Sequence, residues 1–531
     1  MTFAPEIYDT TLRDGAQGAG VSFSPSAAAR LVRALDEFGV DFIEGVLPAS
    51  PDRAEAFYAP LRALPLRHAR LAAFGATCRI GSDAPSDPGL LALLAAETPV
   101  VTIFGKASLF HVRNVLQTSP EENLRIVSAS VAFLRNASRD VFFDAEHFFD
   151  GFAADPDYAL AVLDAASAAG ASRLVLCDTN GGSLPSAVTA AVAAVRARFP
   201  DLPVGIHAHN DSSLAVANSL AARSAGATHY QGSVNGIGER VGNTDLCSLL
   251  PLLALKLGDP LACAPSLPSL RALSRLLDEL LDRRPDPSRP FVGDHAFTHK
   301  AGMHADAVAK IPSSFEHIDP AAVGNTRHIP VSALSGRDNV RAKTGELGVS
   351  PPPSDPELES ILRQIKWMEA DGYQFETADA SFRLLIEKAM GRHVPFFDLR
   401  AFHVDVAKSD SASPPSTIAT VKVAVNGREE LGAGEGTGPV DALNSALRLV
   451  LRRFYPALDA VVLQDYHVRI LDPETATRAV TRVVIESTDG AHTWGTVGVS
   501  PNIIEASWQA LVDSFEYKLL LDARARAASP A

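Results

Sequence analysis

Residues 203–211, PVGIHAHND, begin as an apolar run typical of a buried strand and end in polar side chains. A strand of a (β/α)8 barrel has this pattern where it leaves the core and reaches the end of the barrel that carries the active site. His207 and His209 are two residues apart, so on a strand they project from the same face and can hold one metal ion. The alternative interpretation is two surface histidines on a loop.

Short apolar runs recur along the first half of the chain at intervals of about thirty residues, which is the length of a βα unit. They begin near Ile7, Asp41, Leu71, Val100, Val141, Leu174, Val204 and His229. Alanine-rich amphipathic segments, such as 26–37 and 158–168, lie between them and are predicted to be outer helices. The sequence therefore predicts an α/β fold, a (β/α)8 TIM barrel over residues 1–284.

Two proline-rich stretches, 285–290 and 351–356, are predicted to mark domain boundaries. Residues 285–400 are expected to form a linker of helical subdomains, with helices between 357 and 392, although an ordinary helical subdomain fits equally well. Residues 401–525 are expected to form a C-terminal α+β domain.

The C-terminal part contains a weak internal repeat. Each half is predicted to run strand, turn, strand, glycine loop and helix: residues 421–427 come before a helix from Val440, and residues 483–490 come before a helix from Ile503. The glycine-rich segments 432–439 and 495–501 are expected to be loops before these helices, where a helix N-terminus can receive a carboxylate. A domain that only dimerises is the alternative.

The composition excludes several classes of protein. The chain has 531 residues, 47% of them hydrophobic, and a formal net charge of −14 from 62 acidic and 48 basic residues. Because no long run of Lys and Arg is present, nucleic acid is not expected as a partner. No uncharged stretch of membrane-spanning length and no signal peptide is found, so no membrane partner and a cytoplasmic location are expected. The four cysteines are widely spaced and are expected to be reduced.

Two further polar segments can join the histidines at the same end of the barrel. Residues 6–17, EIYDTTLRDGAQ, supply the Asp14 carboxylate, and residues 235–243, NGIGERVGN, supply the Asn243 amide. One carboxylate, two imidazoles and one amide oxygen suit Zn²⁺, Mn²⁺ or Mg²⁺, and the lack of thiolates leaves the identity of the divalent ion open.

The segments DTTLRDGAQ, HAHND and NGIGERVGN are similar to signatures of the Claisen-condensing acyltransferases that include isopropylmalate, homocitrate and citramalate synthases. The segments VVTIFGK, FDAEHFFDGF, VLCDTNGG, FTHKAGMHADAVAK, FEHIDP, LSGRDNV and GYQFE resemble the long-form citramalate synthases of that family. The similarity runs from about Glu6 to the C-terminal region. It implies that Asp14, His207, His209 and Asn243 are the metal ligands.

The same resemblance implies roles for four more side chains. Arg13 is expected to be catalytic and to bind substrate, with a structural ion pair as the alternative. Glu146 matches the family's active-site glutamate, for which flanking aromatic side chains could favour base chemistry. Thr179 corresponds to a hydroxyl that contacts the carboxylate of the 2-oxo acid, or it is a turn or N-cap residue. His304 matches a catalytic histidine supplied by the partner subunit, or it is a helix-surface histidine.

The chain departs from the family pattern at two places. Phe315 stands where relatives carry a tyrosine, whose hydroxyl is implicated in proton handling. In the segment 43–50, IEGVLPAS, Val46 and Leu47 replace the usual glycine and tryptophan and alter a loop at the mouth of the barrel. This change bears on which 2-oxo acid is preferred, since one methylene is worth only about 1–3 kcal/mol of discrimination.

The resemblance implies a metal-dependent acyltransferase that condenses acetyl-CoA with a 2-oxo acid, pyruvate being favoured, to give (R)-citramalate for isoleucine biosynthesis. It also implies a homodimer and isoleucine as an effector of the C-terminal regulatory domain. An isopropylmalate synthase or a related condensing enzyme is the alternative within this class, and a catalytically impaired amino-acid-binding paralogue is the alternative outside it.

Overall fold

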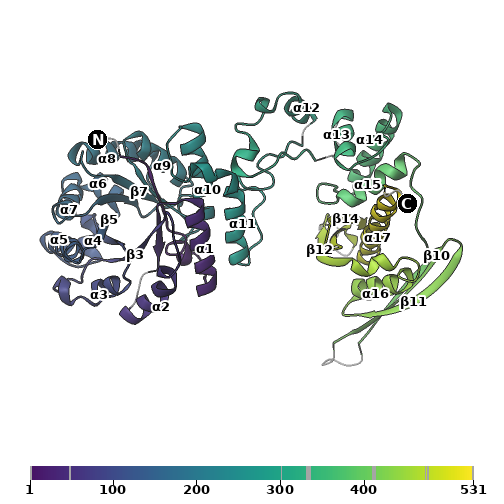
Figure 1. The fold of residues 1–531 in the computed structure, drawn as a ribbon, viewed down its shortest axis with the longest axis horizontal. Helices are drawn as coiled ribbons and strands as arrows, with labels where there is room; N and C mark the ends of the chain where they lie inside the picture. The colour runs from purple at the N-terminus through teal and green to yellow at the C-terminus, as the bar shows by residue number, and fades with distance from the viewer. Residues whose placement is uncertain are drawn as a thin grey trace. The chain divides into compact units, whose positions relative to one another are not determined.

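A computed structural model describes residues 3–46, 50–300, 302–330, 336–408, 414–472, 474 and 478–528. The chain divides into two compact units, one formed by residues up to 297 together with 317–327, the other by residues 298–316 together with those from 328 onward. Figure 1 shows the elements of both units. The boundaries expected at residues 284 and 400 stay a prediction.

The first unit is a closed barrel of eight parallel strands, so the predicted fold is confirmed (Figure 1). The strands pair in chain order, and β8 pairs with β1 to close the barrel. They are β1 (Glu6–Asp9), β2 (Phe42–Gly45), β3 (Arg70–Ala76), β4 (Val100–Lys106), β5 (Asp140–Glu146), β6 (Arg173–Asp178), β7 (Val204–Ala208) and β8 (His229–Gly232). Each begins within one residue of a predicted apolar run.

Helices surround the strands. Ser24 caps the first helix by accepting a hydrogen bond from Ala27 N, and Gly39 ends it at φ 93°, a left-handed conformation that favours glycine. The predicted segments 26–37 and 158–168 are confirmed as α1 and α7. The helices are α1 (Pro25–Phe38), α2 (Pro51–Arg62), α3 (Pro88–Ala95), α4 (Leu109–Asn114), α5 (Pro120–Asn136), α6 (Phe148–Ala154), α7 (Pro156–Ala168), α8 (Pro185–Arg198), α9 (Ala215–Ser224), α10 (Leu246–Pro251) and α11 (Leu270–Leu280).

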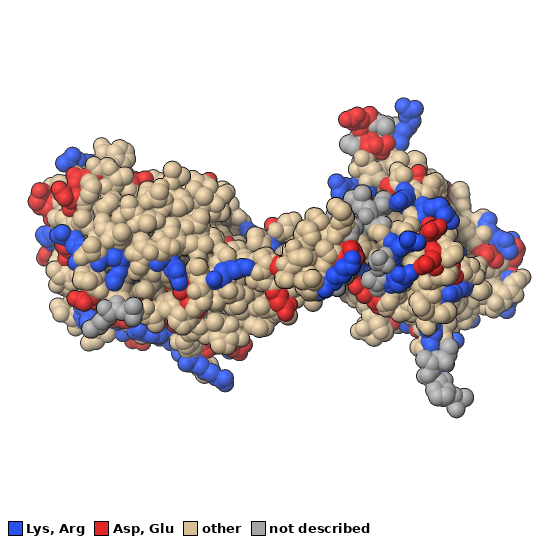
Figure 2. All heavy atoms as spheres, turned by 90° about the horizontal axis from the view of Figure 1, so that it is seen from above, with Lys and Arg blue, Asp and Glu red and all other residues tan. Residues whose placement is uncertain are grey.

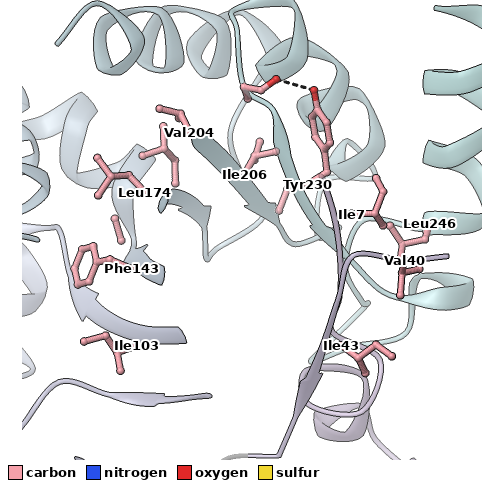
Figure 3. Close-up of a cluster of buried hydrophobic side chains, with 14 of the residues drawn as sticks. Ile7, Val40, Ile43, Ile103, Phe143, Leu174, Val204, Ile206, Tyr230 and Leu246 are labelled. Atoms are coloured by element: carbon pink, nitrogen blue, oxygen red, sulfur yellow. Dashed lines mark hydrogen bonds between the residues drawn. The ribbon is translucent and has the colours of Figure 1, made fainter. Parts of the chain in front are cut away.

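Alternation along the strands divides the apolar core into two layers. One set of strand residues packs toward the helices, as Figure 3 shows for Ile7, Ile103 and Ile206. In the same layer Tyr230 donates its hydroxyl proton to Ala227 O at 2.7 Å. The other set lies inside the barrel, where the rings of Tyr8, Phe42 and Phe142 contact one another.

The second unit begins with four helices and continues with two strand-rich motifs. The helices are α12 (Gly302–Lys310), α13 (Arg337–Glu346), α14 (Asp355–Ala370) and α15 (Asp379–Ala389), which confirms the helices expected between 357 and 392. Ser354 and Glu357 form a capping box that fixes the start of α14. Each strand-rich motif is an antiparallel three-stranded sheet followed by a helix.

The internal repeat is confirmed, but each half contains one more strand than the sequence predicts. The first half is β9 (Asp398–Ala407), β10 (Ser416–Val425), β11 (Arg428–Gly436) and α16 (Pro439–Leu451). The second half is β12 (Val462–Ile470), β13 (Thr481–Thr488), β14 (Thr493–Ser500) and α17 (Ile503–Ala528). The edge strands β9 and β12 are mostly exposed, so they lack the apolar pattern that marks a buried strand.

The expectation of glycine loops at 432–439 and 495–501 is wrong for most of both segments, because these residues belong to β11 and β14. Gly432, Gly434 and Gly436 are every second residue of β11, and a Cβ on each would overlap Val450, Ala446 and Ala442 of α16. A Cβ on Gly498 of β14 would likewise overlap Ala506 O of α17. The glycines therefore allow each helix to pack closely on its sheet.

The sheet of the second half is covered on both faces. The helix α17 packs on one face, and Val497 and Val499 of β14 complete a core with Phe382 and Ile386 of α15 on the other. Residues before and after position 400 thus share one apolar core.

Figure 2 shows acidic and basic side chains interspersed on the visible face of each unit. Among the described helices, none is both long and apolar enough to cross a membrane.

Candidate metal centre and active site

The predicted ligands lie on neighbouring strands because the barrel is closed. The strand β8 pairs with β7 on one side and with β1 on the other. Asp14 follows β1, His207 lies in β7, His209 comes directly after it, and Asn243 follows β8. An isolated bridge also pairs His209 with Asn243. Residues more than 200 positions apart in the chain therefore meet at the carboxyl end of the barrel.

Asp14, His207 and His209 form a compact buried cluster. Asp14 Oδ2 lies 3.4 Å from His207 Nε2 and 3.8 Å from His209 Nε2, and the two Nε2 atoms are 3.3 Å apart. Throughout the part of the chain that the structure describes, this is the one group of three acidic, histidine or cysteine side chains close enough to hold an ion. The structure therefore brings these three predicted side chains together, and their role as metal ligands stays a prediction.

The Asn243 side chain adds an oxygen to this cluster. Its Nδ2 lies 3.3 Å from His207 Nε2, and its Oδ1 is buried without a hydrogen-bond partner among the described residues. A Cβ on Gly238 would overlap Asn243 Oδ1 and approach Asp14 Oδ1 to 3.2 Å, so the absence of a side chain there leaves room for both oxygens. Two imidazoles, a carboxylate and an orphaned amide oxygen fit a divalent ion.

The electrostatics of the cluster suit ligation. Burial alone would raise the pKa of Asp14, but the guanidinium of Arg13 and the two imidazoles hold it well below its usual range. Burial and then repulsion from His207 lower the pKa of His209 to about 3, so this imidazole is neutral near pH 7. Burial is the largest influence on His207 and opposes its protonation, but the contact with Asp14 and the negative charges of Asp14 and Asp144 together raise its pKa.

Arg13 is held rigidly beside the cluster. Its Nη1 donates to Asp14 Oδ2 at 2.8 Å and its Nε donates to Glu44 Oε2 at 2.5 Å. The guanidinium carbon lies 3.8 Å from the centre of the Phe74 ring. The predicted alternative of a structural ion pair is therefore present, because Arg13 pairs with two carboxylates. Its Nη2 has no partner among the described residues, so the same side chain can also contact a substrate.

Glu44 is a site residue that sequence reasoning missed. It is the third residue of β2 and is fully buried, with Oε1 accepting from Tyr8 OH at 2.7 Å. The Tyr8 hydroxyl also lies 2.7 Å from Thr102 Oγ1. The available signal was a carboxylate inside an apolar strand, which is costly unless it has a partner.

Glu146 ends β5 at the same edge of the barrel. Its Oε2 pairs with Lys106 Nζ at 2.5 Å, and Lys106 is its register partner at the end of β4. The adjacent His147 stacks on His111 with ring centroids 3.5 Å apart. The environment of Glu146 thus contains a lysine ammonium and imidazoles in addition to the aromatic side chains noted in the sequence.

Thr179 follows β6 and has an oriented hydroxyl. Its Oγ1 accepts from the backbone N of His147 at 2.8 Å, which leaves its own proton to donate. Arg240, which sequence reasoning missed, binds both oxygens of Asp211 at 2.7 and 2.8 Å and Thr179 O at 2.8 Å. Arg240 therefore ties together the loops that follow β6, β7 and β8.

His304 and Phe315 belong to the second unit. His304 lies on α12, is exposed, and stacks on Phe315 with ring centroids 4.2 Å apart and planes inclined by 26°. Both therefore lie outside the barrel unit. Of the altered loop 43–50, Leu47 and the two residues after it lie outside the described residues.

Comparison with known proteins gives a consistent result over the whole chain. Residues 4–274 match the HMGL-like family, residues 291–372 the Homocitrate synthase post-HMGL domain-like family, and residues 376–519 the LeuA allosteric (dimerisation) domain. The (R)-citramalate synthase of Aquifex aeolicus (strain VF5) is 48% identical over 97% of this chain and 98% of its own length. The (R)-citramalate synthases of Geobacter sulfurreducens and Synechocystis sp. are 46% and 47% identical, each over 97% of this chain and over 97% and 96% of their own lengths.

Proposed function

This chain belongs to the HMGL-like family and within it to the (R)-citramalate synthases, and on that basis we propose that it condenses acetyl-CoA with pyruvate and water to give (R)-citramalate and CoA. It is an acyltransferase that converts the acyl group to an alkyl group on transfer. The observation that carries the proposal is the buried cluster of Asp14, His207 and His209 beside Arg13. We propose that this reaction supplies isoleucine biosynthesis.

The ligand chemistry fits a divalent ion held by Asp14, His207, His209 and Asn243, and we propose Mg²⁺, Mn²⁺ or Zn²⁺. Such an ion, when bound, supplies Lewis-acid polarisation of the ketone of a 2-oxo acid. Arg13 lies against Asp14 through Nη1, so its free Nη2 can donate to the ketone oxygen as negative charge develops there.

We assign the proton transfer to Glu146. Its carboxylate accepts a proton from the methyl group of the thioester, and the electron pair of the broken C–H bond forms the new C–C bond to the ketone carbon. The π pair of the ketone moves onto its oxygen, which then takes up a proton to become the hydroxyl of the product. Lys106 Nζ, at 2.5 Å, fixes the position of this carboxylate. Thr179 donates its hydroxyl proton to the carboxylate of the 2-oxo acid, and water then hydrolyses the thioester to release CoA.

We further propose that His304 is a catalytic residue supplied by the partner subunit of a homodimer. His304 is exposed and belongs to a unit other than the barrel, as a side chain that serves the barrel of another subunit would require. The match of residues 376–519 to a dimerisation domain supports a dimer.

The same C-terminal match supports regulation, and we propose isoleucine as the effector. Most glycines of the two expected loops lie in strands packed against α16 and α17, so only the last residues of each segment, directly before the helix, form a loop. We propose the cytoplasm as the compartment, a choice supported by the four free, buried cysteines.

The test is CoA release from acetyl-CoA by the purified protein across a panel of 2-oxo acids, with and without added divalent ion. Pyruvate is expected to give the highest kcat/KM, and chelation to abolish release. The His207→Ala variant should lose release because one ligand is gone, whereas His467→Ala, an exposed histidine of the second unit, should keep it. Preference for a larger branched 2-oxo acid would make the chain an isopropylmalate synthase, and no release with any acid would make it an impaired paralogue.

A further inference from the structure

The edge of the His207 ring that points away from Asp14 also has a hydrogen-bond partner. His207 Nδ1 lies 2.9 Å from Gln231 Oε1, while Nε2 faces Asp14 and His209. Gln231 is the register partner of His207 on the adjacent strand β8. The backbone pairing of two strands therefore brings this amide to the imidazole, without a contribution from any loop.

The orientation of the Gln231 amide is fixed in turn by a carboxylate. Gln231 Nε2 donates to Asp144 Oδ1 at 3.2 Å, and Asp144 lies in β5 on the opposite side of the barrel interior. Asp144, Gln231 and His207 are 2%, 1% and 4% exposed, so water does not compete for these hydrogen bonds.

We propose that Gln231, held by Asp144, is a positioning residue that sets the tautomer of His207. An amide nitrogen only donates and an amide oxygen only accepts. With Nε2 of Gln231 donating to Asp144, its Oε1 must face His207, so Nδ1 of His207 carries the ring proton. The lone pair of the imidazole is then on Nε2, which is the atom directed at Asp14.

A neutral amide suits this position better than a carboxylate. Asp14, Glu44 and Asp144 are already buried carboxyl groups in the barrel interior, and a further buried negative charge would be costly. Glutamine transmits the orientation set by Asp144 without adding charge. A histidine that ligates a metal commonly donates its other ring N–H to such a partner, and loss of the partner costs about 10–100-fold in metal affinity.

The inference rests on the proposed metal site, so its test measures Co²⁺ binding directly, by affinity and by the visible absorption spectrum of the bound ion. Gln231→Leu should weaken Co²⁺ binding about 10–100-fold and alter the spectrum. Gln231→Glu keeps an acceptor at the same place but adds a buried negative charge beside Asp144, so it should recover only part of the affinity. Gln509→Leu removes a half-buried glutamine of the second unit, which accepts from Tyr373 OH and Val499 N, and should leave both readouts unchanged.

Each outcome decides between the two assignments. If the intact protein does not bind Co²⁺, the metal site and this inference both fall. If it binds Co²⁺ and the folded Gln231→Leu protein binds it equally, only the role of Gln231 is overturned. Should Gln231→Leu fail to fold, Gln231→Met keeps the length of the side chain, removes both hydrogen bonds and carries the same expectation.

Discussion

Glu44 Oε2 accepts a hydrogen bond from Arg13 Nε at 2.5 Å, and both side chains are buried in the barrel. Burial raises the pKa of Glu44, although its bonds to Arg13 and Tyr8 oppose that shift. The other edge of the guanidinium binds Asp14. Arg13 is thus fixed between Glu44 of β2 and the proposed metal ligand Asp14, so its direction depends on Glu44, which is not among the proposed ligands.

This relationship predicts that Glu44→Gln lowers kcat by at least about tenfold with a smaller change in KM. The amide replaces a charge-assisted hydrogen bond with a weaker neutral one, and Arg13 is then less firmly directed at the reacting oxygen. Steady-state kinetics of CoA release measure this. Tyr8→Phe removes the other partner of Glu44 and should have a smaller effect; equal kcat values for Glu44→Gln and the parent protein would contradict the prediction.

Gly238→Ala should abolish or strongly weaken metal binding. The added Cβ would overlap Asn243 Oδ1, so the amide must turn away from Asp14. Calorimetric titration of the divalent ion measures the loss of affinity. We expect it to exceed about tenfold, because removing only a hydrogen-bond partner of a metal ligand already costs about 10–100-fold. Gly182→Ala is the matched control, since its Cβ would meet no atom within 4 Å. Similar affinities for the two variants would show that Asn243 is not a ligand.

Phe315→Tyr should raise kcat more than it lowers KM. Phe315 stacks on His304, so a tyrosine hydroxyl there would lie beside the proposed catalytic histidine. A positioned proton donor acts mainly in the transition state, and an increase of about tenfold is expected. Phe396→Tyr adds the same hydroxyl elsewhere in the second unit as a control. An unchanged or lower kcat for Phe315→Tyr would mean that this chain moves the proton by other groups.

The stability of the barrel should fall as the pH rises from about 4 to 7, in part because of Asp9. This carboxyl is fully buried, accepts from Thr11 N and Thr11 Oγ1, and has its pKa raised by burial to about 7. The folded state keeps the proton in that window while the unfolded chain releases it, so the stabilisation is present below about pH 4 and is lost by about pH 7.

Asp9→Asn removes this dependence. The free energy of unfolding of the variant relative to the parent should increase between pH 5 and pH 8, by about 1–4 kcal/mol, since one unit of pKa shift corresponds to about 1.4 kcal/mol. Thermal unfolding at both pH values measures it. A difference that stays constant with pH would show that Asp9 is ionised in the folded protein.

Isoleucine should bind the intact chain and inhibit CoA release, and leucine and valine should do so more weakly. A truncation at about residue 405 is not a suitable test, because it removes Val497 and Val499 from the core that they share with Phe382 and Ile386. Calorimetry on the full chain and initial rates at increasing isoleucine are the measurements. No heat of binding would assign residues 376–519 a structural role, and equal inhibition by all three amino acids would contradict isoleucine as the specific effector.

The sequence alone located the eight strands and the residues that gather at their carboxyl ends. Each strand is a local apolar run, and a closed parallel barrel brings its carboxyl ends together whatever the loops contain. That is why Asp14, His207, His209 and Asn243 were assigned to one site before any distance was known. The edge strands β9 and β12 were missed because their exposed residues lack the apolar alternation of a buried strand.

Only the tertiary structure decided which polar side chains support the site and what the glycines do. Glu44, Asp144 and Gln231 are single polar residues within barrel strands, and their partners lie 24 to 87 positions away. No local pattern records such a pairing, because it depends on barrel closure and strand register. In sequence the glycines of β11 resemble a flexible loop, but they belong to a strand. Glycine is needed there because α16 approaches the strand too closely for a side chain, and this approach is visible only in the folded structure.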